Sequence, residues 1–137
     1  ILETRTQGKN KLYRLHKNNK ELTKQFLQII ENAKTYHFYK TKPSIKHLLE
    51  ELKPQIKGII ILFGSQANNT NNELSDIDLY IIGSYNKDKI KEIEKTYNIK
   101  IDIKQAKTYE ENTLTKEIRK NHIIIKGVEE AVNYFNE

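Results

Sequence analysis

An uninterrupted apolar run near the middle of the chain most constrains what this sequence can fold into. Residues 58–63 read GIIILF and are rich in branched side chains. Such a run is typical of a strand that is buried on both faces, because a strand with one wet face alternates apolar and polar residues. Other parts of the chain must therefore pack on both faces of the sheet. Gly64 and Ser65 end the run, and ten mostly polar residues follow before the next apolar pattern.

The remaining periodicities predict a small sheet with helices packed on it. Strand patterns fall at 76–82, 99–103 and 123–125, and helix patterns at 87–97, 114–118 and 128–135. Thr108 and Glu111 have the spacing of a capping box for the helix that carries Leu114 and Ile118. The fold class that we expect is α/β, a small mixed β-sheet flanked by helices.

Two helices and a hairpin are expected before this sheet. Asn18 or Asn19 can cap a helix from Lys20 to Lys34, and the aromatic cluster at 36–39 either extends it or forms a link. A second helix starts near Pro43 and is limited by Pro54. The first helix carries an apolar stripe that could pair between two chains in a homodimer: Leu22, Phe26, Ile29, Ile30 and Ala33.

The first fifteen residues, ILETRTQGKNKLYRL, read as two extended runs around a glycine turn at Gly8. We therefore divide the chain into a β-hairpin at 1–17, a helical linker at 18–41 and an α/β domain at 42–137. The chain begins with Ile1 and contains no methionine, so we expect it to come from a longer protein.

Charge is unevenly distributed along the chain. The net charge is +6, made up of +8 over residues 1–57 and −2 over residues 58–137. A basic first part joined to a slightly acidic second part suggests two tasks, and the alternative is a solvated, lysine-rich surface. The chain has no cysteine, scattered histidines, no signal-peptide pattern and no apolar run of the roughly 20 residues that a membrane span needs. We expect a cytoplasmic protein without a zinc site.

Acidic side chains gather where the predicted strands begin. Asp76 and Asp78 alternate with Ile77, so both carboxylates lie on one face of their strand. Oxygen ligands of this kind suit Mg²⁺, although an isolated pair is also compatible with two solvated aspartates. Asp102 is a third acid on the next strand pattern, and its alternative is the charged face of an edge strand. Gly64 and Ser65 allow a close backbone approach and hydroxyl donation to a phosphate.

Taken together, these residues resemble a known family. The stretches IIILFGSQA at 59–67 and SDIDLYII at 75–82 resemble the DNA polymerase β superfamily of nucleotidyltransferases, and within it the minimal nucleotidyltransferases of prokaryotes. The resemblance implies that Gly64 and Ser65 bind the triphosphate. It also implies that Asp76, Asp78 and Asp102 are catalytic and hold Mg²⁺, as two ions, with Asp102 as ligand and base.

The resemblance further implies a reaction and a partner. It predicts transfer of a nucleoside monophosphate, AMP from ATP, to a hydroxyl, with a partner toxin protein as one acceptor. Asn68 and Asn69 stand where the family has an Arg-Gly pair, which removes a positive charge near the phosphates. The alternative is a DNA-binding transcriptional regulator whose nucleotidyltransferase-like domain senses nucleotide or mediates protein contacts.

A second resemblance covers only the first fifteen residues. They resemble the last strands and wing of a winged-helix DNA-binding domain, in which basic residues around a glycine turn meet phosphates. Arg5, Lys9, Lys11 and Arg14 fit this role. The resemblance implies that duplex DNA is a partner and that the recognition helix lies upstream of Ile1.

Overall fold

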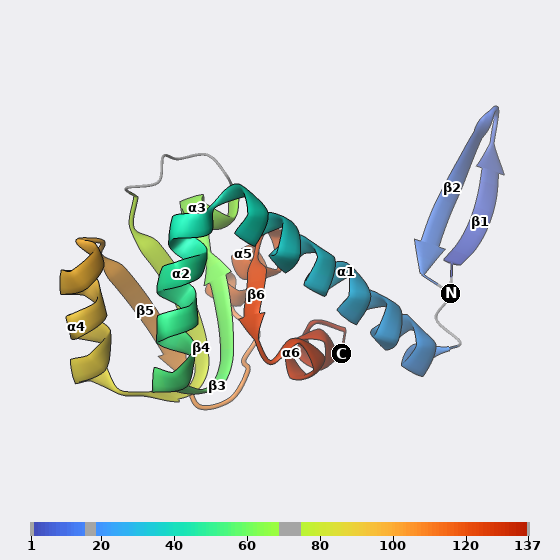
Figure 1. Ribbon diagram of the computed structural model, residues 1–137. Coiled ribbons are helices and arrows are strands. Elements are labelled where there is room, and N and C mark those ends of the chain that lie inside the picture. The colour runs from blue at the N-terminus through green and yellow to red at the C-terminus, as the bar shows by residue number, and fades with distance from the viewer. Residues whose placement is uncertain (1, 16–18, 69–74, 137) are drawn as a thin grey trace.

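The computed structural model of the chain describes residues 2–15, 19–68 and 75–136. Over these residues the elements come in this order: β1 (Leu2–Gln7), β2 (Asn10–Leu15), α1 (Lys20–Thr41), α2 (Pro43–Leu52), the short 3₁₀ helix η1 (Lys53–Gln55), β3 (Ile56–Phe63), α3 (Gly64–Asn68), β4 (Ile77–Tyr85), α4 (Lys87–Tyr97), β5 (Ile101–Ala106), α5 (Thr113–Lys120), β6 (Ile123–Lys126) and α6 (Val128–Phe135). Figure 1 shows the hairpin at one end and the α/β body at the other, with α1 running between them.

The main sheet is mixed and has the strand order β5-β4-β3-β6. The central strand β3 pairs antiparallel with both β4 and β6, and β4 pairs parallel with β5. The predicted fold class, a small mixed sheet flanked by helices, is confirmed. No helix in the described part of the chain is both long and apolar enough to cross a membrane.

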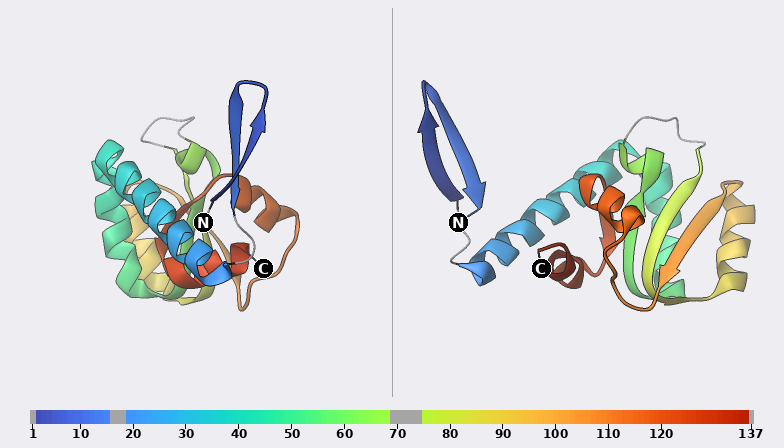
Figure 2. Two further views of the ribbon diagram at one scale, coloured as in Figure 1. Left: turned by 90° about the vertical axis from the view of Figure 1, so that its right-hand side faces the viewer. Right: turned by 180° about the vertical axis from the view of Figure 1, so that it is seen from behind.

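Two layers of helices cover the sheet, as the run in β3 requires. On one face, Leu48 and Leu49 of α2 and Ile90 of α4 pack with Ile60 and Leu62 of β3. On the other face, Ile118 of α5 and Ala131 of α6 pack with Ile59 and Ile61. The two ribbon views from the side and from behind show these layers (Figure 2). β3 is therefore buried on both faces, as its sequence predicts.

Helix α1 is longer than its apolar pattern predicts, because the aromatic cluster continues it to Thr41. Asn19 caps its first turn by accepting from the N–H of Leu22 at 3.1 Å, whereas Asn18 lies outside the described residues. Phe38 is buried in the core, and Thr35 Oγ1 donates to the carbonyl of Ile124 at 2.8 Å. The segment that we expected as a helical linker thus contains a helix that also packs against the body.

The predicted capping box of α5 is wrong. The cap is Asn112, whose side chain accepts from the N–H of Thr115 at 2.9 Å, while Thr115 Oγ1 accepts from the N–H of Asn112 at 2.8 Å. Thr108 lies four residues further back, and its hydroxyl donates to the carbonyl of Tyr109. Asn is as good a cap as Thr, and the threonine hydroxyl at the third helical position replaces the expected glutamate.

Close contact between β3 and β4 depends on two glycines that face each other. Gly58 (φ +114°) pairs with Gly83 (φ +144°), and a Cβ on Gly83 would overlap the carbonyl oxygen of Lys57.

We expect Gly83→Ala to lower the free energy of unfolding by about 1–3 kcal/mol through backbone strain alone, with the overlap adding to this. Urea unfolding followed by circular dichroism measures the change. The exposed neighbour variant Ser84→Ala should change it little, and equal stability of the two variants would contradict the argument.

Candidate active site

Two neighbouring strands bring two acidic side chains to the same level. β4 and β5 run parallel, and Asp78 pairs in register with Asp102. Residues at the same level of a parallel pair point to the same face of the sheet. Ile77 and Leu79, on the other face, are fully buried. Asp78 and Asp102 therefore share one face of the sheet.

Asp76 lies just before β4, two residues ahead of Asp78, and is exposed. The N–H of Ile77 donates to the carbonyl of Lys100 at 2.9 Å, which fixes the start of β4 against the segment that leads into β5. Asp76 and Asp78 thus flank Ile77, whose backbone N–H is hydrogen-bonded to Lys100. This hydrogen bond holds the two acids next to the start of β5.

Electrostatics show that the three carboxylates interact. Burial raises the pKa of Asp78 above its usual value of 3.8, and the negative charges of Asp102 and Asp76 raise it further, while Lys104 and Lys100 lower it. Lys104 Nζ lies 3.9 Å from Asp102 Oδ2, and both side chains are about half exposed. Asp78 and Asp102 are both half-buried, whereas Asp76 is exposed.

Gly64 lies directly against Asp78. Phe63, the last residue of β3, pairs with Asp78, and Gly64 follows with φ +73°. A Cβ on Gly64 would overlap Asp78 Oδ2, so only glycine lets the chain turn here beside the carboxylate. Ser65 follows in the first turn of α3 and is half-buried.

A buried polar cluster that the sequence did not reveal supports this turn. Lys42, between α1 and α2, is 6% exposed, and its Nζ donates to the Gln66 carbonyl at 3.2 Å and to Gln66 Oε1 at 2.9 Å. Gln66 Nε2 in turn donates to the carbonyl of Ser75 at 3.1 Å. Gln66 follows Ser65 and Ser75 precedes Asp76, so this cluster joins the two halves of the motif. Nothing in the sequence sets Lys42 apart from its many neighbouring lysines.

Several predicted residues lie elsewhere or outside the described part. Arg5 and Lys9 are exposed on the hairpin, which Figure 1 places beyond the far end of α1 from β4 and β5. The side chains of Lys11 and Arg14 lie outside what the structure describes. Asn68 is the last residue of α3, and Asn69 lies outside the described residues.

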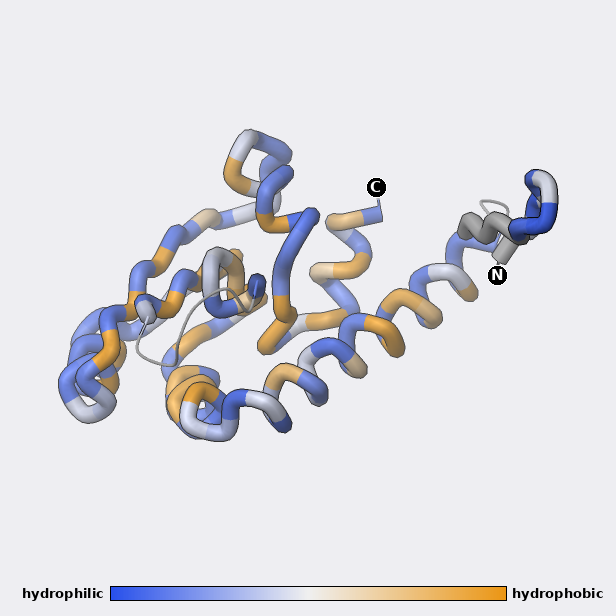
Figure 3. The backbone as a smooth tube through the Cα atoms, turned by 90° about the horizontal axis from the view of Figure 1, so that it is seen from above, coloured by the Kyte–Doolittle hydropathy of each residue, from blue (hydrophilic) through white to orange (hydrophobic). Residues whose placement is uncertain are grey.

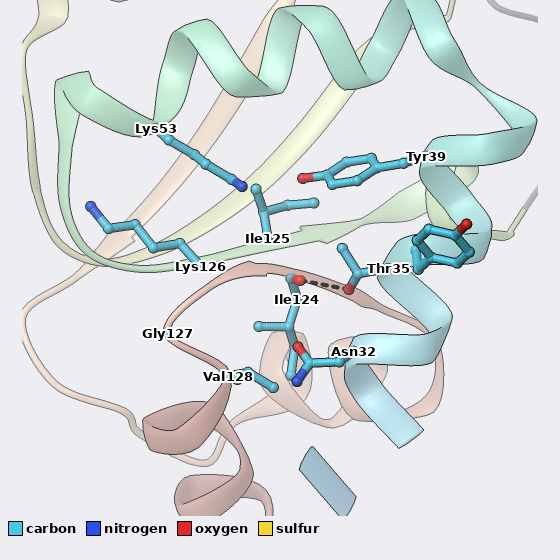
Figure 4. A pocket seen from close by; sticks show the side chains of 10 residues that line it. Asn32, Thr35, Tyr39, Lys53, Ile124, Ile125, Lys126, Gly127 and Val128 are labelled. Atoms are coloured by element: carbon cyan, nitrogen blue, oxygen red, sulfur yellow. Dashed lines mark hydrogen bonds between the residues drawn. The ribbon is translucent and has the colours of Figure 1, made fainter. Parts of the chain in front are cut away.

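Three of the cavities in the described part of the chain lie beside α1, and the aspartates line none of these three. One, of about 180 Å³, is lined by Lys42, Phe38 and Gln66 among others and lies against α3. A second, of about 200 Å³, is lined by Leu27, Glu31 and His122 among others. The third, of about 300 Å³, lies between α1, β6 and the start of α6. Figure 4 shows Tyr39 and Lys53 pointing toward each other in this cavity, while Thr35 is bonded to the carbonyl of Ile124. Among the described residues, no three His, Cys, Asp or Glu side chains form a group that could hold a metal ion.

The sequence over residues 43–130 matches the family described as polymerase beta, nucleotidyltransferase. The chain belongs to this family. The matched segment runs from α2 to the first turns of α6 and includes Gly64, Asp78 and Asp102, so the resemblance drawn from the sequence motifs is confirmed for the family. Among curated proteins, no significant match was found.

Solved structures similar to this chain include three toxin–antitoxin structures. One is the crystal structure of a toxin-antitoxin with AMP-PNP, with 18% sequence identity and a TM-score of 0.49 over 69% of this chain and 79% of that one. The second, a mutant of a toxin-antitoxin that contains MntA, has 16% identity and a TM-score of 0.48 over the same shares. The third, the toxin-antitoxin MntA-HepT, has 16% identity and a TM-score of 0.43 over 69% of this chain and 76% of that one.

The raised pKa of Asp78 makes a prediction about stability. Because the folded state binds the proton of Asp78 more tightly than the unfolded state does, ionisation above that pKa costs stability. In metal-free buffer, Asp78→Asn should therefore have a higher melting temperature than the wild type at pH 7. The difference should shrink as the pH falls through the raised pKa of Asp78 and disappear below 3.8, where both the folded and the unfolded carboxyl are protonated.

Thermal unfolding at a series of pH values measures this difference. The matched control is Glu92→Gln, which removes an acid whose side chain is 67% exposed on α4 and should leave the melting temperature nearly unchanged. A lower melting temperature for Asp78→Asn at pH 7 would show that the carboxylate is held by favourable contacts instead.

Proposed function

We propose that this chain is an active nucleotidyltransferase that moves a nucleoside monophosphate, AMP from ATP, to the hydroxyl of an acceptor. The observation that carries the proposal is the register of Asp78 with Asp102, directly against Gly64, in a member of this family. A transferase needs acidic groups beside the turn that holds the phosphates, and a chain that only sensed nucleotide would not need Asp102.

In this proposal Gly64 and Ser65 hold the triphosphate. Gly64 has no side chain between the backbone and the ligand, and Ser65 can donate its hydroxyl to a phosphate oxygen. The Lys42–Gln66 contacts fix this turn from behind through buried hydrogen bonds. The turn is therefore preorganised, which reduces the entropy cost of binding the substrate in a reactive geometry.

Asp76, Asp78 and Asp102 would hold Mg²⁺. Carboxylate oxygens, together with substrate phosphates, are the ligands that Mg²⁺ prefers, and the charges of Asp102 and Asp76 act on Asp78. The three side chains do not form a ready-made metal group in the described structure, so in this proposal the phosphates of the bound nucleotide complete the site. Bound Mg²⁺ would supply positive charge that stabilises the phosphate oxygens as they become more negative. Such an ion would also relieve the mutual repulsion that raises the pKa of Asp78.

Asp102 has the further role of base in this proposal. The acceptor oxygen forms a bond to the α-phosphorus of ATP, the bond from that phosphorus to the bridging oxygen breaks, and pyrophosphate leaves. The acceptor proton moves to the carboxylate of Asp102. This side chain is 45% exposed, so an acceptor can reach it from solvent. The family resemblance favours a hydroxyl on a partner toxin protein as the acceptor.

Substitutions at the two acids should separate binding from transfer. Asp78→Asn should remove the gain in ATP affinity that Mg²⁺ gives, as titration calorimetry measures. Asp102→Asn should leave most ATP binding intact but lower label transfer from α-labelled ATP by about 10²–10⁴-fold, the usual contribution of a general base.

The transfer assay needs an acceptor and a control. Proteins encoded beside the gene, and proteins captured by the full chain, are the acceptors to test. Asp88→Asn, an exposed acid in the first turn of α4, is the matched control and should transfer label like the wild type. If the wild type labels none of these acceptors while ATP changes its affinity for DNA, the chain is a nucleotide sensor and not a transferase.

A second function is favoured by the hairpin. The turn residues are Gly8 and Lys9, and only Gly8 has a positive φ, +63°. A positive φ at the first of two turn residues is typical of the type II′ turn of a β-hairpin. Arg5 and Lys9 are exposed on this hairpin and carry positive charge. We propose that the hairpin contacts the phosphates of duplex DNA. The winged-helix resemblance itself stays a prediction, since the structure describes only the hairpin there.

Binding through phosphates should depend steeply on salt. The sample is the longest natural chain that contains this sequence, and the variant combines Arg5→Ala with Lys9→Ala. We expect the slope of log K for DNA binding against log [salt] to become less steep by about 2 in this variant, since each phosphate contact contributes about 0.9. Fluorescence anisotropy with a labelled duplex at a series of salt concentrations measures the slope. Lys91→Ala and Lys95→Ala on α4 are the control pair with the same loss of charge. An equal change of slope in both pairs would leave no specific role for the hairpin.

A further inference from the structure

Helix α1 presents large apolar side chains to solvent. Ile29 and Tyr36 are each 65% exposed, Leu22 is 40% exposed and Ile30 is 38% exposed, and these are the large apolar side chains that stand out as exposed among the described residues. In the tube coloured by hydropathy, apolar segments recur along α1, including the part that extends beyond the body (Figure 3). Large apolar surface grouped on one element is a usual sign of an interaction site.

These side chains have the spacing of a coiled-coil seam. Leu22, Phe26, Ile29, Ala33 and Tyr36 follow one another at intervals of four, three, four and three residues. This is the a and d pattern of a heptad repeat, which places every member on one side of the helix. The occupant that this pattern fits best is therefore another α-helix lying along α1.

The opposite side of α1 is already in use. Glu31 Oε2 lies 3.0 Å from Nε2 of the buried His122, Thr35 donates to the carbonyl of Ile124, and Phe38 is in the core. Because these contacts hold α1 in helical form against the body, a partner does not have to order it. The usual cost of forming a helix from coil is therefore absent from the association.

Charge distinguishes between a second copy and other partners. The residues that flank the seam are uncharged: Thr23, Gln25, Ile30, Asn32 and His37. The helix does carry charges: Lys20, Glu21, Lys24, Glu31 and Lys34 lie off the seam, and Lys40 lies at its end, with Nζ 5.4 Å from the centroid of the Tyr36 ring. Residues 1–57, which include α1, carry a net charge of +8, so the charged faces of this part of two copies repel each other. A neutral, apolar seam is the place where two copies can meet without bringing like charges together.

We infer that α1 is the dimer interface of this protein, with the seam of one copy packed against the seam of a second copy about a two-fold axis. A two-fold pair uses the same surface on both copies, which a continuous heptad seam provides. The seam runs from Leu22 to Tyr36 within the 22-residue helix, so it is about 21 Å long at 1.5 Å per residue. The seam precedes residues 43–130, which match the family, and the dimer does not depend on the proposed transfer activity.

The first experiment measures mass in solution. Sedimentation equilibrium of the full chain should give about twice the mass of one 16.2 kDa chain. Ile29→Glu combined with Tyr36→Glu should weaken dimerisation by about 100-fold or more, because each copy would bury two unpaired charges. Lys91→Glu on α4 changes the net charge by the same amount and should leave the dimer intact.

Circular dichroism keeps this test independent of folding. Both altered residues are exposed, so the double variant should keep the spectrum of the wild type. A wild type that stays monomeric at all concentrations would overturn the inference. A double variant that is folded and still a dimer would also overturn it. The same holds if a seam variant remains a dimer and loses only the binding of a different protein.

Cross-linking then determines how the helices run. The chain has no cysteine, so each introduced cysteine is a unique probe. If the helices are parallel, Leu22→Cys should form a disulfide with the same cysteine in the second copy, and so should Tyr36→Cys. If they are antiparallel, only a mixture of the two variants should cross-link, since each residue then faces the other. Absence of a cross-link in all three samples, with a dimer present, would place the interface elsewhere and overturn the inference.

Discussion

The pairing of β3 with β4 is the constraint on which the candidate site depends. Phe63 faces Asp78 across this pair, so the turn that begins at Gly64 lies against the Asp78 carboxylate. A shift of one residue would turn Asp78 into the core and an isoleucine out of it. Because both faces of β3 are packed, such a shift has a high cost, and the apolar run that fills the core also fixes the position of the acids.

The candidate site is an arrangement of charges that does not favour stability. Asp78 is partly buried between two other carboxylates, and its pKa is raised for that reason. Hydrogen bonds elsewhere in the fold hold the arrangement in place. Lys42 and Gln66 are both buried, and their contacts run from the junction of α1 and α2 to the carbonyl of Ser75 just before Asp76. The charged site is thus held by buried polar contacts outside it, as preorganised sites require.

Helix α1 connects the parts of this chain through its two different sides. Its inner side is fixed to the body by Phe38, Thr35 and the contact of Glu31 with His122. Its outer side carries the apolar seam, in which Leu22, Ile29 and Tyr36 are exposed. The hairpin precedes it and the family-matched segment follows it. A dimer formed through α1 would therefore place two hairpins and two candidate active sites in one particle, so that binding of DNA and transfer to a protein could act on the same assembly.

The sequence by itself determined the elements and the family, because these depend on local patterns. The apolar run at 58–63, the helix at 87–97 and the Gly64–Asp78 motif are each read from neighbouring residues, and the structure and the family match agree with them. The roles of the site residues remain predictions. Only the tertiary structure decided that Asp102 lies level with Asp78 and that Lys42 reaches Gln66. Strand register and contacts across 24 or more residues depend on how the elements pack, and periodicity within one element carries no information about its neighbours in space.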